Sequence, residues 1–236
     1  MPANGLSGLN RLLEVVRKHG MPIETLPAGH APPQAGELLC GMPVDQLLAA
    51  AFASCGKLVL GRMGSEVPLL IRCDDEVNGL LLDNQEWQGY FPHEFWPDHF
   101  RALLLFGGEM LYRYATVPEL SSPEGKQPVV RVDPYEDIHA LPVASDLDQF
   151  FDIYSRYVEI MAEDEGYRSG GAAWVRFPYD VPELIARDRP LVGLIRDGRF
   201  DRWLYERTKA GRSTEDDNAP TRAWINEVLS LAGTSA

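Results

Sequence analysis

The segment from residue 145 to residue 161 constrains the fold more than any other part of the chain. Its apolar side chains recur at intervals of three and four residues, which places them on one face of an α-helix. They are Leu147, Phe150, Phe151, Tyr154, Tyr157, Val158 and Met161. Ser145 and Asp148 resemble a capping box, so we expect this helix to begin at Ser145. A helix with so broad an apolar face requires a second layer, and we expect that layer to be a sheet.

Short apolar runs between glycines, prolines and charged residues indicate the strands of this sheet. The runs span residues 57–60, 67–71, 79–82, 102–106, 110–115 and 128–133. Gly107 and Gly108 stand between two of these runs. Paired glycines are typical of tight hairpin turns, because glycine readily adopts a positive φ. The sequence therefore predicts an α+β fold with a single twisted, mostly antiparallel sheet flanked by helices.

Two helices and a proline-rich strap precede most of these strands. The apolar spacing predicts a helix over residues 7–19 and another over residues 43–55, with Pro43 in the first turn of the second helix. Between them, residues 22–33 contain four prolines and are predicted to be an extended strap or linker.

The end of the chain is predicted to be helical. We expect helices over residues 181–187 and 200–210, and a final helix that opens at Pro220. The chain is thus divided into three parts. These are an N-terminal helix and strap over residues 1–35, an α+β domain over residues 36–162, and a helical C-terminal extension over residues 163–236.

The charge of the chain is concentrated before residue 163. The formal net charge is −13, and residues 1–162 carry 22 acidic and 11 basic side chains, a balance of −11. Such a surface repels phosphate backbones, so we expect no nucleic-acid partner. It favours a basic protein partner instead, and it also serves solubility.

Composition also indicates where the protein resides. No run approaches the roughly 20 apolar residues of a membrane helix, and the first residues lack a secretory pattern, so we expect no membrane association. The three cysteines, Cys40, Cys55 and Cys73, have no metal-binding spacing and suit reduced thiols. We therefore expect a cytoplasmic protein.

The sequence contains no motif typical of a catalytic or nucleotide-binding site. Neither GxSxG, GxGxxG nor GxxxxGK[ST] occurs, and His93 and His99 are expected to be packed or surface histidines. We therefore expect no enzyme activity, no catalytic residue and no cofactor.

One acidic cluster leaves a metal-dependent hydrolase open as an alternative. Its residues are Asp133, Glu136, Asp137 and His139, whose oxygen and imidazole groups are possible ligands of a divalent cation. A solvated acidic turn is the simpler interpretation, and no metal site is predicted.

Tyrosines and carboxylates mark the candidate binding surface. Tyr112 and Tyr114 alternate with their neighbours along a strand and therefore share one face. The predicted binding surface also includes a loop that contains Asp133, Tyr135, Glu136 and Asp137. Tyrosine offers contact area with a polar tip, and carboxylates pair with arginine and lysine, so this composition indicates protein recognition. Burial of the tyrosines under the long helix is the alternative.

The order of these pieces resembles the SUKH superfamily over residues 36–162. The resemblance rests on three segments: Leu104 to Gly108 followed by Tyr112-Arg113-Tyr114, then residues 128–137 (PVVRVDPYED), and finally residues 142–151 (PVASDLDQFF). The family implies a single twisted sheet flanked by helices and used for binding.

The resemblance also implies a function. Many bacterial members of the superfamily act as immunity proteins, which bind and neutralise toxins that are often nucleases, and fungal members are scaffolds. We therefore expect a protein-binding module whose partner is a basic, nuclease-type toxin. A scaffold subunit of a constitutive complex, docked through its C-terminal helices, is a further alternative. The identity of the partner, the binding face and the oligomeric state stay open.

Overall fold

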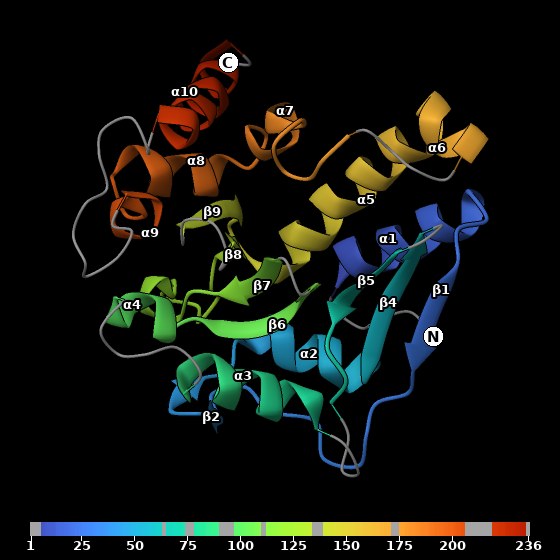
Figure 1. Ribbon diagram of the computed structural model, residues 1–236. Helices are drawn as coiled ribbons and strands as arrows, with labels where there is room; N and C mark the ends of the chain where they lie inside the picture. The colour runs from blue at the N-terminus through green and yellow to red at the C-terminus, as the bar shows by residue number, and fades with distance from the viewer. Residues whose placement is uncertain are drawn as a thin grey trace.

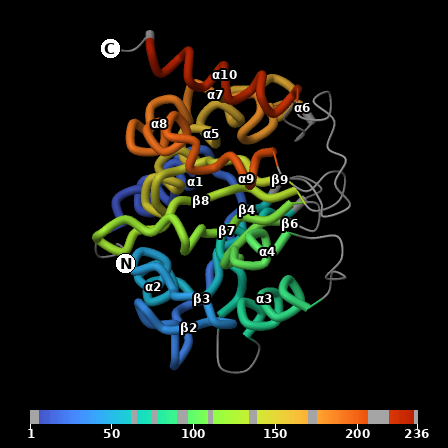
Figure 2. Tube along the Cα trace, turned by 90° about the vertical axis from the view of Figure 1, so that its left-hand side faces the viewer, coloured from blue at the N-terminus to red at the C-terminus, as the bar shows by residue number. Residues whose placement is uncertain are grey.

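A computed structural model describes the chain over residues 6–62, 65–73, 78–89, 97–109, 112–133, 139–170, 175–205 and 219–234. The predicted α+β class is confirmed. Strands run through the middle of the molecule, α2 (Gln46–Ser54) and α3 (Gly79–Gly89) lie at one end, and the C-terminal helices cover the other (Figures 1 and 2). Within the described ranges, no helix is long and apolar enough to span a bilayer.

The strands form two larger antiparallel sheets rather than one continuous ladder. The first sheet has the order β1 (Ile23–Leu26), β4 (Lys57–Arg62), β5 (Ser65–Leu70). The second has the order β6 (Leu104–Glu109), β7 (Tyr112–Thr116), β8 (Val129–Asp133), β9 (His139–Ala144). A short hairpin joins β2 (Leu38–Leu39) to β3 (Met42–Pro43). The two larger sheets adjoin where the backbone N–H of Ile71 donates to the carbonyl oxygen of Phe106 at 2.7 Å. The expected single sheet is therefore two sheets laid side by side.

Gly107 and Gly108 explain how these sheets meet, although they do not form the predicted turn. Both lie inside β6, opposite Tyr114 and Arg113, beside a register shift that marks a β-bulge. A Cβ on Gly107 would lie 2.9 Å from the carbonyl oxygens of Pro68 and Leu69, so only glycine permits this approach of the chain next to β5. Gly108 has a φ of +103°, which disfavours any other residue. The prediction of a turn at this pair was wrong, and residues 110–111, which follow β6, lie outside the described residues.

The helix predicted from residue 145 is present as α5 (Leu147–Glu163), but its cap differs from the prediction. Asp146 is the N-cap, and its carboxylate accepts the backbone N–H of Gln149 at 2.8 Å. Asp148 is used elsewhere: it accepts from Ser7 Oγ at 2.8 Å and from the Gly8 N–H at 2.7 Å. It therefore satisfies the first turn of α1 (Ser7–Lys18), which packs along α5. The local sequence pattern is the same whether Asp148 belongs to a capping box of α5 or caps a second helix. The packing of α1 against α5 decides between the two.

Two other predicted elements are corrected. Pro43 belongs to β3, and α2 begins only after Asp45, whose carboxylate accepts the N–H groups of Leu47 and Leu48 at 2.6 and 3.0 Å. The run at residues 79–82, predicted as a strand, is the first turn of α3. Asn78 Oδ1 accepts the Leu81 N–H there at 2.9 Å and thereby acts as a helix cap.

The predicted packing of α5 on the sheet is confirmed by an aromatic cluster. Tyr114 on β7 lies 4.9 Å from Phe150 and 6.2 Å from Tyr154, measured between ring centroids. Phe177, from the C-terminal part of the chain, lies 5.1 Å from Tyr154 and 5.3 Å from Tyr157. The core is therefore continuous across residue 163, where the sequence analysis places a domain boundary.

The remaining helices complete the C-terminal layer. They are α6 (Glu165–Gly170), α7 (Pro182–Ile185), α8 (Arg189–Arg196), α9 (Asp201–Tyr205) and α10 (Ala219–Thr234), while α4 (Asp98–Arg101) and the 3₁₀ turn Pro118–Leu120 belong to the earlier part. Helices α8 and α9 contact the edge strand β9, and α10 packs on α7 and α8 (Figure 1). This edge of the second sheet is thereby covered.

Candidate functional site

The candidate site lies at one end of the second sheet, where two hairpins finish side by side. Arg113 on β7 is paired with Val132 on β8, so Tyr112 and Asp133 come next to each other at this end. Asp133 is in turn paired with His139 at the start of β9. We call this region the hairpin end and define it by Tyr112, Arg131, Asp133, His139 and Tyr179. The structure thus brings together two of the residues predicted for binding, Tyr112 and Asp133.

Tyr114 is not part of any surface, and its prediction as a binding residue is corrected. Its side chain is 1% exposed and packs beneath α5. Burial raises the pKa of its hydroxyl well above the ordinary value. Tyr112 is half-buried, with its ring centroid 5.5 Å from that of Tyr114. Tyr114 is therefore buried under the long helix, which was the alternative interpretation, whereas Tyr112 lies at the edge of the buried cluster.

The predicted loop residues Tyr135, Glu136 and Asp137 lie outside the described residues. Asp133, at the end of β8, is half-exposed. In the described part of the chain, no three His, Cys, Asp or Glu side chains gather as metal ligands would. The metal alternative therefore depends on the loop residues and stays a hypothesis.

Arg131 is the central residue of the hairpin end and was not predicted. Its guanidinium carbon lies 4.4 Å from the ring centroid of Tyr112 and 4.9 Å from that of Tyr179. Its Nη1 donates to the Tyr179 hydroxyl oxygen at 2.7 Å, and the residue is only 9% exposed. A desolvated cation between two rings contributes about 2 kcal/mol. Arg131 therefore holds Tyr112 in a fixed position and ties the segment around Tyr179 to the sheet.

The hydroxyl of Tyr179 contacts two other side chains of the hairpin end. Its hydroxyl lies 3.3 Å from His139 Nε2 and receives the hydrogen bond of Arg131. Burial is the main cause that raises the pKa of Tyr179, and Asp133 adds to it, whereas Arg131 opposes it. The phenol is therefore protonated at neutral pH and is a poor nucleophile or base.

Other candidate reactive groups are held in packing roles. His99 Nε2 lies 3.1 Å from the carbonyl oxygen of Arg202, and its ring stands edge-on to Trp203 at 5.7 Å, which confirms a packed histidine; His93 lies outside the described residues. Burial raises the pKa of the Cys40 and Cys55 thiols, which disfavours the reactive thiolate.

Comparison with known proteins adds no family to this picture. No protein-family model, curated protein or solved structure matched the chain. The resemblance to the SUKH superfamily is therefore carried by the residues quoted above and by the element order alone.

Proposed function

We propose that this chain is a non-catalytic protein-binding module of the immunity type, which binds a basic, nuclease-type toxin through the hairpin end. The observation that carries the proposal is the alignment of the two hairpins, which sets Tyr112 beside Asp133 at one end of the sheet. An aromatic ring next to a carboxylate is a composition suited to arginine and lysine side chains of a partner.

The hairpin end is also rigid, which favours binding. Tyr112 stacks on Arg131, and Arg131 is bonded to Tyr179, so the ring loses little freedom when a partner covers it. Ordering a mobile side chain costs about 0.5–1.5 kcal/mol, and a pre-positioned ring avoids most of that cost.

Charge supports a basic partner. Residues 1–162 carry twice as many acidic as basic side chains, and in their described part Glu14, Glu66, Glu86 and Asp98 are exposed. A nuclease presents a cationic cleft to its substrate, and an acidic inhibitor complements that cleft and accelerates the encounter. Binding of this kind weakens as salt rises.

The test is binding to a panel of basic nuclease domains, with basic proteins that are not nucleases as controls, measured calorimetrically at low and at physiological salt. Asp133→Arg is compared with Glu14→Arg, which changes the net charge equally but lies on α1. We expect one nuclease to bind, and Asp133→Arg to weaken it at least tenfold more than Glu14→Arg. Equal loss in both variants would show that only net charge matters and would remove the hairpin end from the proposal. Binding that leaves nuclease activity intact would favour a scaffold.

A further inference from the structure

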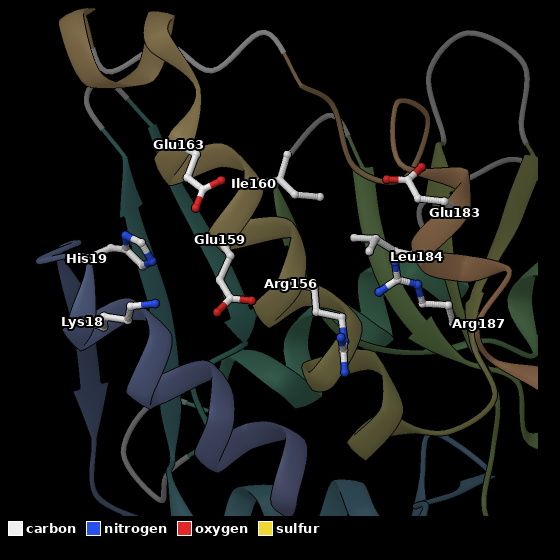
Figure 3. Close-up of a pocket in the computed structure, with 9 residues that line it drawn as sticks. All are labelled: Lys18, His19, Arg156, Glu159, Ile160, Glu163, Glu183, Leu184 and Arg187. Carbon is white, nitrogen blue, oxygen red and sulfur yellow. The ribbon is translucent and has the colours of Figure 1, made fainter.

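A concave surface lies between three helices, away from the hairpin end. It is a hollow of about 410 Å³ formed by the end of α1, the second half of α5, and α7 with the residues just after it (Figure 3). This volume lies within the range of ligand pockets, roughly 300–1,000 Å³. The hollow shares no residue with the hairpin end.

The hollow is polarised along its length. Figure 3 shows Glu163 and Glu183 toward one end, and Lys18, Arg156 and Arg187 toward the other, where the carboxylate of Glu159 also lies. The sequence gives the same order on both walls. Arg156 and Glu163 are seven residues apart on α5, which corresponds to about 10 Å along the helix axis. Glu183 and Arg187 are one turn apart on the facing wall.

Some of the charges in the hollow already have partners. Glu159 is paired with Arg11 at 3.3 Å, and Arg156 is paired with Asp152 at 3.0 Å. These pairs fix two side chains of the floor.

Four other charges make no ion pair or side-chain hydrogen bond with the described residues: Lys18, Glu163, Glu183 and Arg187. In addition, His19 Nε2 is buried without a hydrogen-bond partner among these residues. Two cations and two carboxylates thus face one hollow without being paired to each other.

Two apolar side chains lie between the two ends of the hollow. Ile160 is half-buried and Leu184 is buried, and both line the hollow between its charged ends. A ligand that fits must therefore carry a cation at one end, an apolar middle and an anion at the other end. Three extended residues span about 10 Å, which matches the separation of the charged ends along α5.

We propose that this hollow binds a short peptide, or the last three residues of a longer chain, with its C-terminal carboxylate at the Arg187 end and a cationic group at the Glu183 end. An apolar side chain in the middle covers Ile160 and Leu184. This inference does not depend on the proposed function, because it uses other residues and another ligand.

The test uses the tripeptide Arg-Ala-Ala, titrated into the full chain labelled for NMR. We expect saturable shifts confined to amide signals of α1, α5 and α7, with a dissociation constant in the millimolar range. Amidation of the peptide's carboxylate should weaken binding about tenfold, since it removes one charge-assisted contact. Acetylation of the peptide's amino group distinguishes a free peptide from the end of a longer chain. Unchanged binding indicates the end of a longer chain, and lost binding indicates a free peptide.

Variants locate the contacts. Arg187→Gln and Glu183→Gln should each weaken binding about tenfold. Arg196→Gln, an exposed arginine on α8, is the matched control and should bind as the wild type does. Absence of saturable shifts, equal binding of the amidated peptide, or equal binding by all three variants would overturn the inference.

Discussion

Phe177 joins the C-terminal part of the chain to the core, and its removal has a predictable cost. The ring is 7% exposed and stands within 5.1–6.4 Å, centroid to centroid, of four aromatic rings. These rings are Tyr114, Phe150, Tyr154 and Tyr157. Phe177→Ala removes the ring from all four contacts at once and leaves a cavity beside α5.

The expected loss follows from the size of the group removed. Replacing a buried phenylalanine by alanine costs about 3–5 kcal/mol, because the transfer free energy is lost and the cavity is only partly refilled. Phe177 retains slight exposure and lies where the segment after residue 175 enters the core, so partial collapse is possible. We therefore expect a decrease of about 3 kcal/mol in the free energy of unfolding.

Urea denaturation, followed by far-UV circular dichroism, measures this quantity. The control is Leu38→Ala, whose side chain is 66% exposed and should change stability by less than about 0.5 kcal/mol. A decrease below about 1 kcal/mol for Phe177→Ala would refute the continuous core and would support a separable extension. A change of the slope with urea would instead show that the two parts unfold separately.

Three further predictions concern buried links. Asp45 caps α2 and also accepts the Gln127 N–H at 2.7 Å, so Asp45→Ala should cost about 2–4 kcal/mol in urea denaturation, and a cost below about 1 kcal/mol would contradict this role. Gly107→Ala forces a Cβ against two carbonyl oxygens, and we expect a lowered melting temperature and altered near-UV circular dichroism, whereas an unchanged Tm would contradict the close approach. Burial is the main cause that raises the pKa of Asp188, so the folded state binds its proton more tightly than the unfolded state does. Its contribution to stability is therefore fully present below the unfolded pKa of about 4 and is lost as pH rises through the folded pKa. As the pH is lowered from neutral, the unfolding free energy of the wild type should therefore rise relative to that of Asp188→Asn. A difference between the two proteins that does not vary with pH would contradict the raised pKa.

The elements that were predicted correctly have strong periodic patterns. The apolar face of α5 and that of α1 repeat at helical spacing, and most strands are apolar runs bounded by glycine or charge. An element that buries one face has apolar residues at the positions that form this face, so the local sequence suffices to identify it.

The missed elements depend on partners distant in sequence. Strand β1 lies within the proline-rich strap, and its residues are mostly exposed, so no alternation marks it; its pairing with β4 makes it a strand. Strand β9 was not among the predicted strands; it contains Pro142, which is tolerated there because β9 is an edge strand. For α3, the three successive leucines after Gly79 fit a strand or a helix equally well, and the Asn78 cap decides.

The candidate site was predicted only in part, because some of its residues are brought together by contacts between segments distant in sequence. The antiparallel register of β7 and β8 brings Tyr112 and Asp133 together at one end of the sheet. Arg131 is paired with Tyr114 across β7 and β8 and therefore lies on the tyrosine face, but this register was not predicted from the sequence. Tyr179 is 48 residues from Arg131, and no spacing in the sequence relates the two.

We propose that this chain inhibits a basic nuclease by binding it. The most direct measurement is a titration of the nuclease that binds in the panel, with its activity on nucleic acid followed at physiological salt. We expect a linear loss of activity that is complete at one chain per nuclease, and a weaker loss with Asp133→Arg than with Glu14→Arg. Full activity in the presence of a saturating excess of the chain would contradict the claim.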